Sequence, residues 1–309
     1  MFCCIAARRA EIRAKLGKPV PAAAPVRGPL LMVLAMAGFA LEDTFIKKLT
    51  VSLPVGQVLI LFGLGGMLAF ALIGRAQGQT LRHPAATSTP MLLRGVCEVT
   101  GRLGYTLAIA LTPLSSASAI LQATPLVVAA GAVVFFGEYV GPRRWLAIGA
   151  GFLGVLLILR PGLDGFTPAS LFAVIGTLGF AGRDLATRAA PVSMTNAQLG
   201  LYGFLMMVIA GIIALAFSGG AALPSLGQMG FLALAVLFGV VGYNSLTRAM
   251  RSGDIALVAP FRYTRLIFAM VIGMTVFAER PDTLTLIGSA IIVASGLYTL
   301  FRSHRRASG

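Results

Sequence analysis

The sequence predicts an all-α membrane protein with ten transmembrane helices that form two inverted five-helix repeats. Its 309 residues are 57% hydrophobic and 11% charged, whereas a soluble domain carries roughly 25% charged residues. Apolar stretches long enough to cross about 30 Å of hydrocarbon fill nearly everything from Pro29 to Phe301. Because these stretches are continuously apolar rather than alternating, they favour helices over the strands of a membrane barrel.

Ten such stretches can be counted, and only two linkers, 74–89 and 219–227, are long. Neither linker has room for a folded soluble domain. We expect helices at residues 29–48, 52–73, 90–111, 115–136, 144–160, 168–188, 196–218, 228–250, 254–278 and 283–301.

Basic residues indicate how these helices are oriented. The net charge of +15 would suggest nucleic acid in a soluble protein, but here most of the charge falls in loops. If the N-terminus lies inside, 17 of the 25 Lys and Arg residues, Arg94 among them, fall on the cytoplasmic side and four on the opposite side. By the positive-inside rule, both termini are expected on the cytoplasmic side of the membrane. Nucleic acid is not an expected partner.

Two cytoplasmic tails are expected, at residues 1–28 and 303–309. The first is basic, lacks the apolar core of a signal peptide and is expected to be disordered, unless the translation start is assigned too early. Cys3, Cys4 and Cys97 have neither the spacing of a disulfide framework nor that of a metal site.

The second half of the chain repeats the first. Two segments, "GFALEDTFIKK" at 38–48 and "GFAGRDLATR" at 179–188, share a glycine, a phenylalanine, an alanine and an aspartate. Each shared residue is separated from its counterpart by the same distance in sequence as Gly38 from Gly179, and we call this separation the repeat offset. "FFGE" and "VFAE", which end at Glu138 and Glu279, keep it. These glutamates end corresponding helices and are expected to be anchors or latches at the membrane face, beside loop arginines.

Residues 29–161 and 168–302 are therefore predicted to be two copies of one unit. Five helices per unit is an odd number, so the second copy enters the membrane from the opposite side. Inverted repeats of this kind are how secondary transporters build alternating access around a central site. An old duplication kept only for packing would leave the same pattern.

Ionisable residues inside the predicted helices are the main functional signal. One such side chain at mid-membrane costs roughly 2.5–3.5 kcal/mol on insertion scales, so each needs a partner or water. Four acids and four arginines are expected to form a polar network that lines a cavity: Glu42, Asp43, Glu98, Arg102, Arg183, Asp184, Arg262 and Arg265.

The predicted substrate-binding residues are Asp43, Arg102, Tyr105, Asp184, Tyr243, Arg262, Tyr263 and Arg265. Arg262 and Arg265 have no acid in the same helix turn and are the first choice for an anionic or carbonyl-bearing group, because guanidinium is a planar fork of donors. Alternatively, they bridge to Asp43 and Asp184 only to hold the halves together. Glu98 and Arg102 are four residues apart and are placed to neutralise each other.

Two further roles follow from position. Burial favours the neutral form of a carboxylate, so Asp43, Glu98 and Asp184 are predicted to couple protons to transport. Pro125 and Pro260 lie in corresponding helices of the two halves and are predicted hinges.

The sequence lacks the residue patterns of common catalytic and metal-binding sites. The only histidines, His83 and His304, lie in loops, and neither GxSxG nor HExxH occurs. We therefore expect no enzyme activity, no metal and no cofactor. The sequence also has no Walker-type loop, which argues against direct use of ATP.

The chain resembles a known family in "ALTPLSSASAILQATPLVVAAGAVVFFGEYVGPRRW" and "ALVAPFRYTRLIFAMVIGMTVFAERPD". Both stretches look like the paired EamA-type modules of the drug/metabolite transporter superfamily, and the resemblance covers about residues 29–302. "APFRYTRL" and "FAERPD" are similar to a branch with S-adenosylmethionine and riboflavin uptake carriers. Many relatives have an arginine in the second helix where this chain has Phe62 and Gly63, so a substrate contact assigned to that arginine does not carry over.

The resemblance implies a ten-helix inner-membrane carrier of small organic solutes. Together with the repeat and the charges, it predicts a secondary transporter that uses alternating access, with a small-molecule substrate and the lipid bilayer as partners. A passive metabolite channel and a non-transporting membrane scaffold are the alternatives. Substrate identity, direction, coupling ion and oligomeric state stay open.

Overall fold

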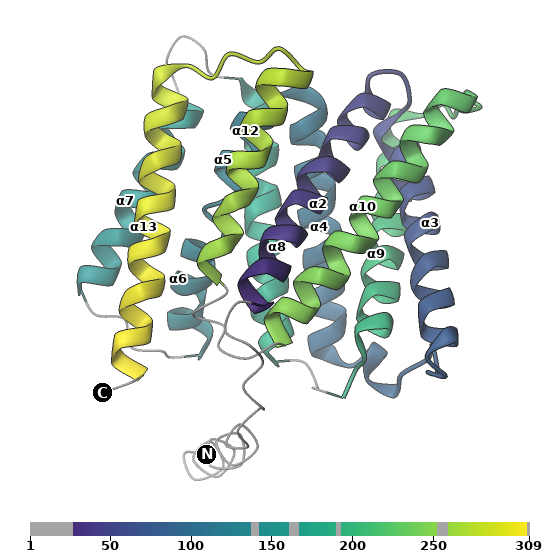
Figure 1. Ribbon diagram of the computed structural model, residues 1–309, viewed down its shortest axis with the longest axis horizontal. Coiled ribbons are helices and arrows are strands. Elements are labelled where there is room, and N and C mark those ends of the chain that lie inside the picture. The colour runs from purple at the N-terminus through teal and green to yellow at the C-terminus, as the bar shows by residue number, and fades with distance from the viewer. Residues whose placement is uncertain (1–26, 137–141, 161–166, 190–192, 252–258, 308–309) are drawn as a thin grey trace.

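The computed structural model describes residues 27–136, 142–160, 167–189, 193–251 and 259–307. Within these ranges the chain forms α-helices and short 3-10 helices, and none of the described residues belongs to a strand. The helices run up and down beside one another in a bundle (Figure 1). α2 begins and α13 ends at the same end of this bundle, which we call the terminus face, and the opposite end is the far face. The predicted all-α class is confirmed for the described residues.

The helices of the first half are α2 (Arg27–Thr50), α3 (Val55–Ala76), α4 (Thr89–Leu111), α5 (Leu114–Leu121), α6 (Thr124–Phe136) and α7 (Pro142–Leu159). Those of the second half are α8 (Leu171–Ala189), α9 (Asn196–Ser218), α10 (Leu226–Arg251), α12 (Thr264–Val276) and α13 (Thr283–Ala307). The short 3-10 helices η1 (Pro84–Thr87), η2 (Pro168–Ser170) and η3 (Ala259–Tyr263) lie between them.

These helices differ from the predicted ones at three places. The predicted helix 115–136 is divided into α5 and α6, and the predicted helix 254–278 is described only from Ala259, as η3 followed by α12. α13 continues to Ala307, so most of the expected tail 303–309 is helical, because no glycine or proline lies between Gly296 and Gly309. Residues 1–26 of the other expected tail lie outside the described residues.

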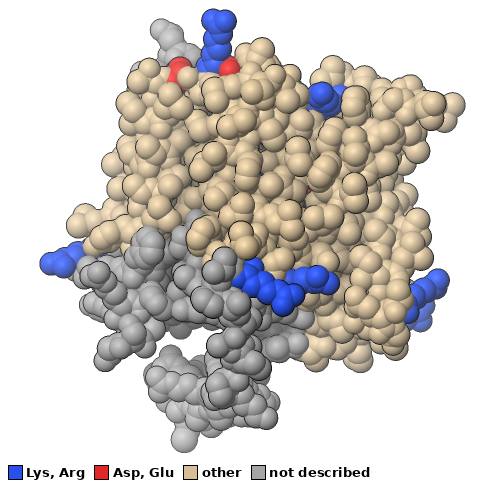
Figure 2. Space-filling model, in the orientation of Figure 1, with Lys and Arg blue, Asp and Glu red and all other residues tan. Residues whose placement is uncertain are grey.

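Several helices are long and apolar enough to cross a membrane. Within the described ranges, six stretches meet this condition: Arg27–Thr50, Val55–Ala76, Leu114–Phe135, Pro168–Thr187, Asn196–Ser218 and Leu226–Met250. Shorter apolar stretches lie in α7 and α13, while α4 has the length but carries Arg94, Glu98 and Arg102. In Figure 2 the lysines and arginines gather near the two ends of the visible face, and the band between them is almost free of charge.

Glycines allow the most extensively packed helix pairs, which are α2 with α10, α4 with α8, α3 with α9, and α7 with α13. A Cβ at Gly38 in α2 would lie 3.0 Å from the carbonyl oxygen of Phe238 and 3.1 Å from Cα of Gly242 in α10. A Cβ at Gly179 in α8 would overlap the backbone of Gly101 in α4. Close crossings at small residues are how membrane helices associate when lipid removes the hydrophobic driving force.

The interruption between α5 and α6 lies in the interior of the bundle. Gln122 and Ala123 leave the helical pattern there, and the Leu121 carbonyl accepts a bond from Thr124 Oγ1 at 2.5 Å. Pro125 cannot donate to that carbonyl because it has no N–H. The Gln122 side chain donates to the Arg262 carbonyl at 3.0 Å, so the interrupted segments α5–α6 and η3–α12 meet here.

We expect Gly179→Ala to destabilise the bundle and Gly149→Ala to leave it unchanged. The methyl group at Gly179 would overlap backbone atoms of Gly101, whereas a Cβ at Gly149 in α7 meets no atom within 4 Å. Overpacking of this kind costs roughly 1–3 kcal/mol. Thermal unfolding of both purified variants in detergent measures the difference, and equal midpoints would contradict the close crossing of α4 and α8.

Candidate functional site

A network of carboxylates and arginines lies inside the bundle. Glu42, Asp43 and Glu98 are each at most 2% exposed, although they are charged residue types. The network comprises Glu42 and Asp43 from α2, Arg94, Glu98 and Arg102 from α4, Arg183 and Asp184 from α8, Arg262 from η3, and Arg265 from α12. The structure therefore brings together all eight ionisable residues expected in such a network, together with Arg94.

Around α2, each carboxylate binds an arginine from another helix. Arg102 Nη1 lies 2.8 Å from Glu42 Oε1, and Arg265 Nη2 lies 2.6 Å from Asp43 Oδ2. The Tyr105 hydroxyl donates to Asp43 Oδ2 at 3.1 Å. These five residues form what we call the α2 cluster.

Around α8, the remaining acids are connected in a chain. Asp184 Oδ1 lies 2.8 Å from Arg183 Nη2, and Asp184 Oδ2 lies 3.5 Å from Arg262 Nη1. Glu98 lies 3.3 Å from Arg183 Nη1 and 3.6 Å from Arg94 Nη2. We call these five residues the α8 cluster.

Arg94 is a member of the network that the sequence analysis missed. It is 5% exposed and donates to Thr187 Oγ1 at 3.1 Å and to the Tyr243 hydroxyl at 3.4 Å. Its place near the start of the predicted helix 90–111 led to its assignment to the cytoplasmic side. The available signal was its spacing of four residues from Glu98, which places both side chains on one helical face. Five arginines therefore face four carboxylates among the described residues of the network.

Arg262 and Arg265, which have no acid in the same helix turn, pair with acids from other helices. They lie three residues apart where η3 joins α12, and each reaches an acid from a different helix, Asp184 on α8 and Asp43 on α2. The structure therefore contains the bridges to Asp43 and Asp184, and solute binding by the two arginines stays a prediction. The two aspartates, which correspond at the repeat offset, thus converge on one interrupted segment.

Glu98 and Arg102 do not form the expected pair. They lie on one face of α4, but Arg102 bonds to Glu42 on α2 and Glu98 pairs with Arg183 on α8 and with Arg94. Each side chain finds a partner on another helix, at 2.8 Å for Arg102 with Glu42 and at 3.3 Å for Glu98 with Arg183.

Aromatic faces cover the guanidinium groups. The Arg265 guanidinium carbon lies 5.3 Å from the ring centroid of Phe39 and 5.2 Å from that of Tyr105, and the Arg183 carbon lies 4.8 Å from that of Phe180. Such cation–π contacts add attraction at a desolvated site. Phe39 and Phe180 also correspond at the repeat offset, so each half places its phenylalanine against an arginine.

The other candidate residues lie at the edges of the network. Tyr243 reaches it through Arg94, whereas Tyr263 is buried with its hydroxyl against Gly296 in α13. Pro125 is the second residue of α6, and Pro260 lies within η3, so both predicted hinges occur at interruptions. Glu138 lies outside the described residues.

Several buried polar atoms of the network have no hydrogen-bond partner within the described part of the chain. They are Asp43 Oδ1, Glu98 Oε2, Arg102 Nε and Arg265 Nε. Buried polar atoms are nearly always bonded, so such atoms need an explanation such as a water or a ligand. Among the described residues, no three His, Cys, Asp or Glu side chains are grouped so as to hold a metal.

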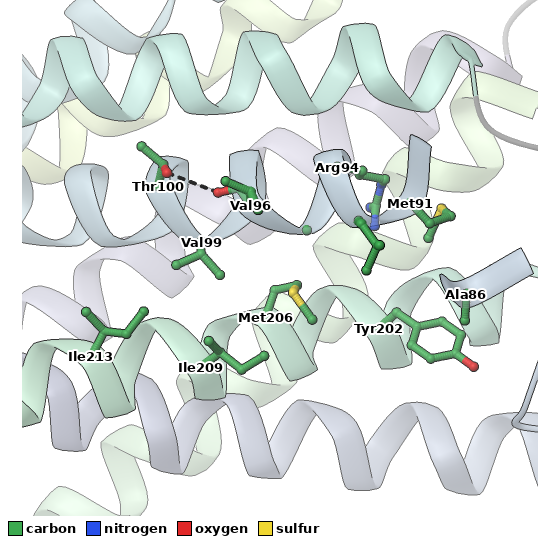
Figure 3. Close-up of a pocket in the computed structure, with 12 residues that line it drawn as sticks. Ala86, Met91, Arg94, Val96, Val99, Thr100, Tyr202, Met206, Ile209 and Ile213 are labelled. Atoms are coloured by element: carbon green, nitrogen blue, oxygen red, sulfur yellow. Dashed lines mark hydrogen bonds between the residues drawn. The ribbon is translucent and has the colours of Figure 1, made fainter. Parts of the chain in front are cut away.

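A groove of about 460 Å³ lies between α4, α9 and η1, beside the network (Figure 3). Figure 3 shows Val99 and Met206 facing across it, Tyr202 near one end and Ile213 at the other. Of the network residues only Arg94 lines it, and it is bordered by exposed apolar side chains such as Val96. This groove therefore opens outward through an apolar surface.

Comparison with known proteins agrees with these features. The profile described as "EamA-like transporter family" matches residues 26–160 and again 167–301. A riboflavin transporter of Rhizobium johnstonii is 29% identical over 91% of this chain and 93% of its own length. An S-adenosylmethionine uptake transporter of Rickettsia bellii is 26% identical over 74% and 78% of the two chains. The pseudopaline exporter CntI of Pseudomonas aeruginosa is 30% identical over 87% and 94%.

A solved crystal structure supports the fold. It has a TM-score of 0.61 and 18% identity, and the match covers 90% of this chain and 99% of the other. The relatives are named as transporters of small metabolites, in agreement with the expected resemblance to riboflavin and S-adenosylmethionine carriers. Because the family profile matches both halves, we conclude that this multi-pass membrane protein belongs to the EamA-like transporter family of the drug/metabolite transporter superfamily.

Proposed function

We propose that this chain is a secondary transporter of the inner membrane, which moves a small organic metabolite by alternating access and does not use ATP. The observation that carries the proposal is the meeting of two interrupted helical segments at a buried charge network. Irregular backbone at membrane depth is tolerated only where protein buries it or where it lines a water-filled cavity. Interrupted helices at such a depth are typical of substrate and ion sites in transporters.

Inverted repeats are the second part of the proposal. The family profile matches the chain twice, and the helix pair α2–α10 corresponds to the pair α8–α4 at the repeat offset. The close crossing of Gly38 with Gly242 corresponds in the same way to that of Gly179 with Gly101. The distribution of Lys and Arg supports cytoplasmic termini. Pro125 and Pro260, at the interruptions, are the proposed hinges.

The proposed solute carries a carboxylate or another anionic or carbonyl group. Five arginines against four carboxylates leave one positive charge in a buried site, which an anionic group would balance. The contact between Arg262 and Asp184 is the point of entry that we favour, because its distance of 3.5 Å is longer than the 2.6 Å between Arg265 and Asp43. Its two side chains are also more exposed, at 26% and 23%.

The names of the relatives guide the choice of candidate solutes. Riboflavin-type vitamins, S-adenosylmethionine and amino acid-like metabolites are the candidates, since relatives are named for riboflavin, S-adenosylmethionine and pseudopaline. Asp43, Glu98 and Asp184 are the proposed proton-coupling residues, and Arg102, Tyr105, Tyr243 and Arg265 complete the proposed site. Tyr263 contributes to the packing of η3 on α13.

We expect a candidate solute to raise the thermal stability of the purified protein and Arg262→Gln to remove this effect. A ligand at 100 times its Kd stabilises the folded state by about 2.7 kcal/mol, and glutamine cannot offer the charge or the paired donors of guanidinium. Arg143→Gln, which changes an exposed arginine at the start of α7, is the control and should keep the shift. If no solute of these classes stabilises the protein, the scaffold interpretation is favoured.

The pair of Asp43 and Arg265 allows structural and transport roles to be separated. Asp43→Asn alone should lower stability by about 3–5 kcal/mol, because it leaves a buried arginine unpaired, and should abolish gradient-driven uptake. The double variant Asp43→Asn with Arg265→Gln should recover most of the stability without recovering uptake. Thermal unfolding and vesicle uptake are measured on the same samples. Recovery of both properties in the double variant would mean that the pair only holds the halves together.

Preloading of vesicles distinguishes a carrier from a channel. For an alternating-access carrier, unlabelled solute inside the vesicles should accelerate entry of labelled solute, because the loaded site returns faster than the empty one. Reconstituted wild-type protein with and without internal solute provides the comparison. Entry at the same rate in both preparations would favour the passive channel.

A further inference from the structure

Glu279 ties the end of α12 to the beginning of α5 at the far face. Its Oε1 accepts the backbone N–H of Leu114 at 2.6 Å, and its Oε2 accepts the N–H of Ser115 at 3.0 Å and the Ser115 hydroxyl at 2.8 Å. The first N–H groups of a helix have no partner within the helix and carry a partial positive charge. One carboxylate therefore satisfies two of the free donors of α5 and joins two helices that have no peptide connection at this end.

Lys47 extends this contact to two further helices. It lies near the end of α2, and its Nζ donates to the Ile109 and Thr112 carbonyls at the end of α4, at 2.8 Å and 2.5 Å. The same nitrogen lies 3.9 Å from Glu279 Oε1. α2, α4, α5 and α12 thus meet at one partly buried polar contact, with side-chain exposures of 15% for Lys47 and 9% for Glu279.

The backbone after α12 is shaped to present Glu279. Ala278 has φ of +52°, a left-handed conformation that is disfavoured for residues with a Cβ. The N–H of Glu279 bonds to the Gly273 carbonyl at 2.9 Å, and a Cβ at Gly273 would lie 2.5 Å from Glu279 Oε2. A strained alanine and a glycine without a side chain therefore make room for this one carboxylate.

We infer that Glu279, with Lys47, is a latch that closes the central network to the far face. α5 carries Ser118, whose Oγ lies 3.0 Å from the Tyr105 hydroxyl of the α2 cluster, and α12 begins beside Arg265. A solute that enters from the far face between these helices must separate the end of α12 from the start of α5, which breaks the bonds of Glu279. Once separated, the carboxylate and the free N–H groups are hydrated, so the open state remains accessible. This inference rests on the proposed transport function, and it assigns Glu279 and Lys47 to gating rather than to solute binding.

Labelling of a buried cysteine tests the latch without any solute. The reporter is Ser118→Cys, at a fully buried position, in a chain in which Cys3, Cys4 and Cys97 are replaced by alanine. A charged, membrane-impermeant thiol reagent is applied to the far face of sealed vesicles. Glu279→Ala should increase the labelling rate about tenfold or more, because it removes charge-assisted hydrogen bonds that favour the closed state.

Asp282→Ala is the matched control. Asp282 lies three residues from Glu279 on the same face and pairs with Arg160, and Arg160 and Thr285 hold the pKa of its carboxyl down at about 2. It does not contact α5, and its side chain is 48% exposed. The labelling rate should therefore equal that of the parent, which is the Ser118→Cys reporter without a further substitution. An unchanged rate in Glu279→Ala, or an equal increase in both variants, would overturn the inference.

A disulfide should replace the carboxylate. The Cβ of Ser115 lies 3.6 Å from a Cβ placed at Gly273, within the range of about 3.5–4.5 Å for disulfides. Ser115→Cys and Gly273→Cys are therefore added to the Ser118→Cys reporter that also carries Glu279→Ala. In this protein the space that the carboxylate occupied is vacant. Oxidation should return labelling to the slow rate of the parent, and reduction should make it fast again. Fast labelling in the oxidised, cross-linked protein would mean that α5 and α12 do not form the gate.

The two proposals fail in different ways. If labelling responds to Glu279→Ala as expected but the protein takes up no solute of the tested classes, the proposed function is refuted and the latch is supported. Uptake by the parent together with unchanged labelling in Glu279→Ala would refute the latch alone.

Discussion

A charge inside a membrane bundle needs an opposite charge from another helix, and this constraint organises the centre of the protein. Asp43 on α2 and Asp184 on α8 each reach one of two arginines, Arg265 and Arg262, on the same interrupted segment. Removal of one partner from a buried pair, such as that of Asp43 with Arg265, typically costs about 3–5 kcal/mol. The pairs therefore hold four elements together. In the transport mechanism that we propose, an anionic solute would compete with a carboxylate for its arginine, and this competition would couple solute binding to the rearrangement of the helices.

The close crossings and the charges occur at the same levels of the bundle. Gly38 is four residues from Glu42, and Gly179 is four residues from Arg183, so each glycine lies about one turn from a network residue. Gly101 directly precedes Arg102. Because Gly101 and Gly179 bring the backbones of α4 and α8 close together, Glu98 on α4 reaches Arg183 on α8. At this crossing the small residues set the geometry in which an ion pair forms.

The sequence was sufficient to predict the helices and most members of the charge network, but not which acid pairs with which arginine. Continuous apolar stretches predict helices because backbone groups in lipid must be bonded within the segment, and a charge in such a stretch predicts burial. Spacing along one helix shows only neighbours on that helix, so it suggested Glu98 with Arg102 and missed Glu42 as the partner of Arg102. The interruption after Leu121 had a local signal in Pro125, four residues later, but its contact with η3 through Gln122 depends on tertiary packing.

The differences between the proposed copies are as informative as their similarity. At the repeat offset, Glu42 corresponds to Arg183, Arg102 to Tyr243, and Arg265 to Thr124. The glycines of the crossings and the two aspartates are kept, whereas most of the other charges are not. In the proposed alternating-access mechanism, a symmetric backbone would let the two halves exchange conformations. The asymmetric set of charges would then give the charge network one chemical character, so that one solute site would serve both conformations.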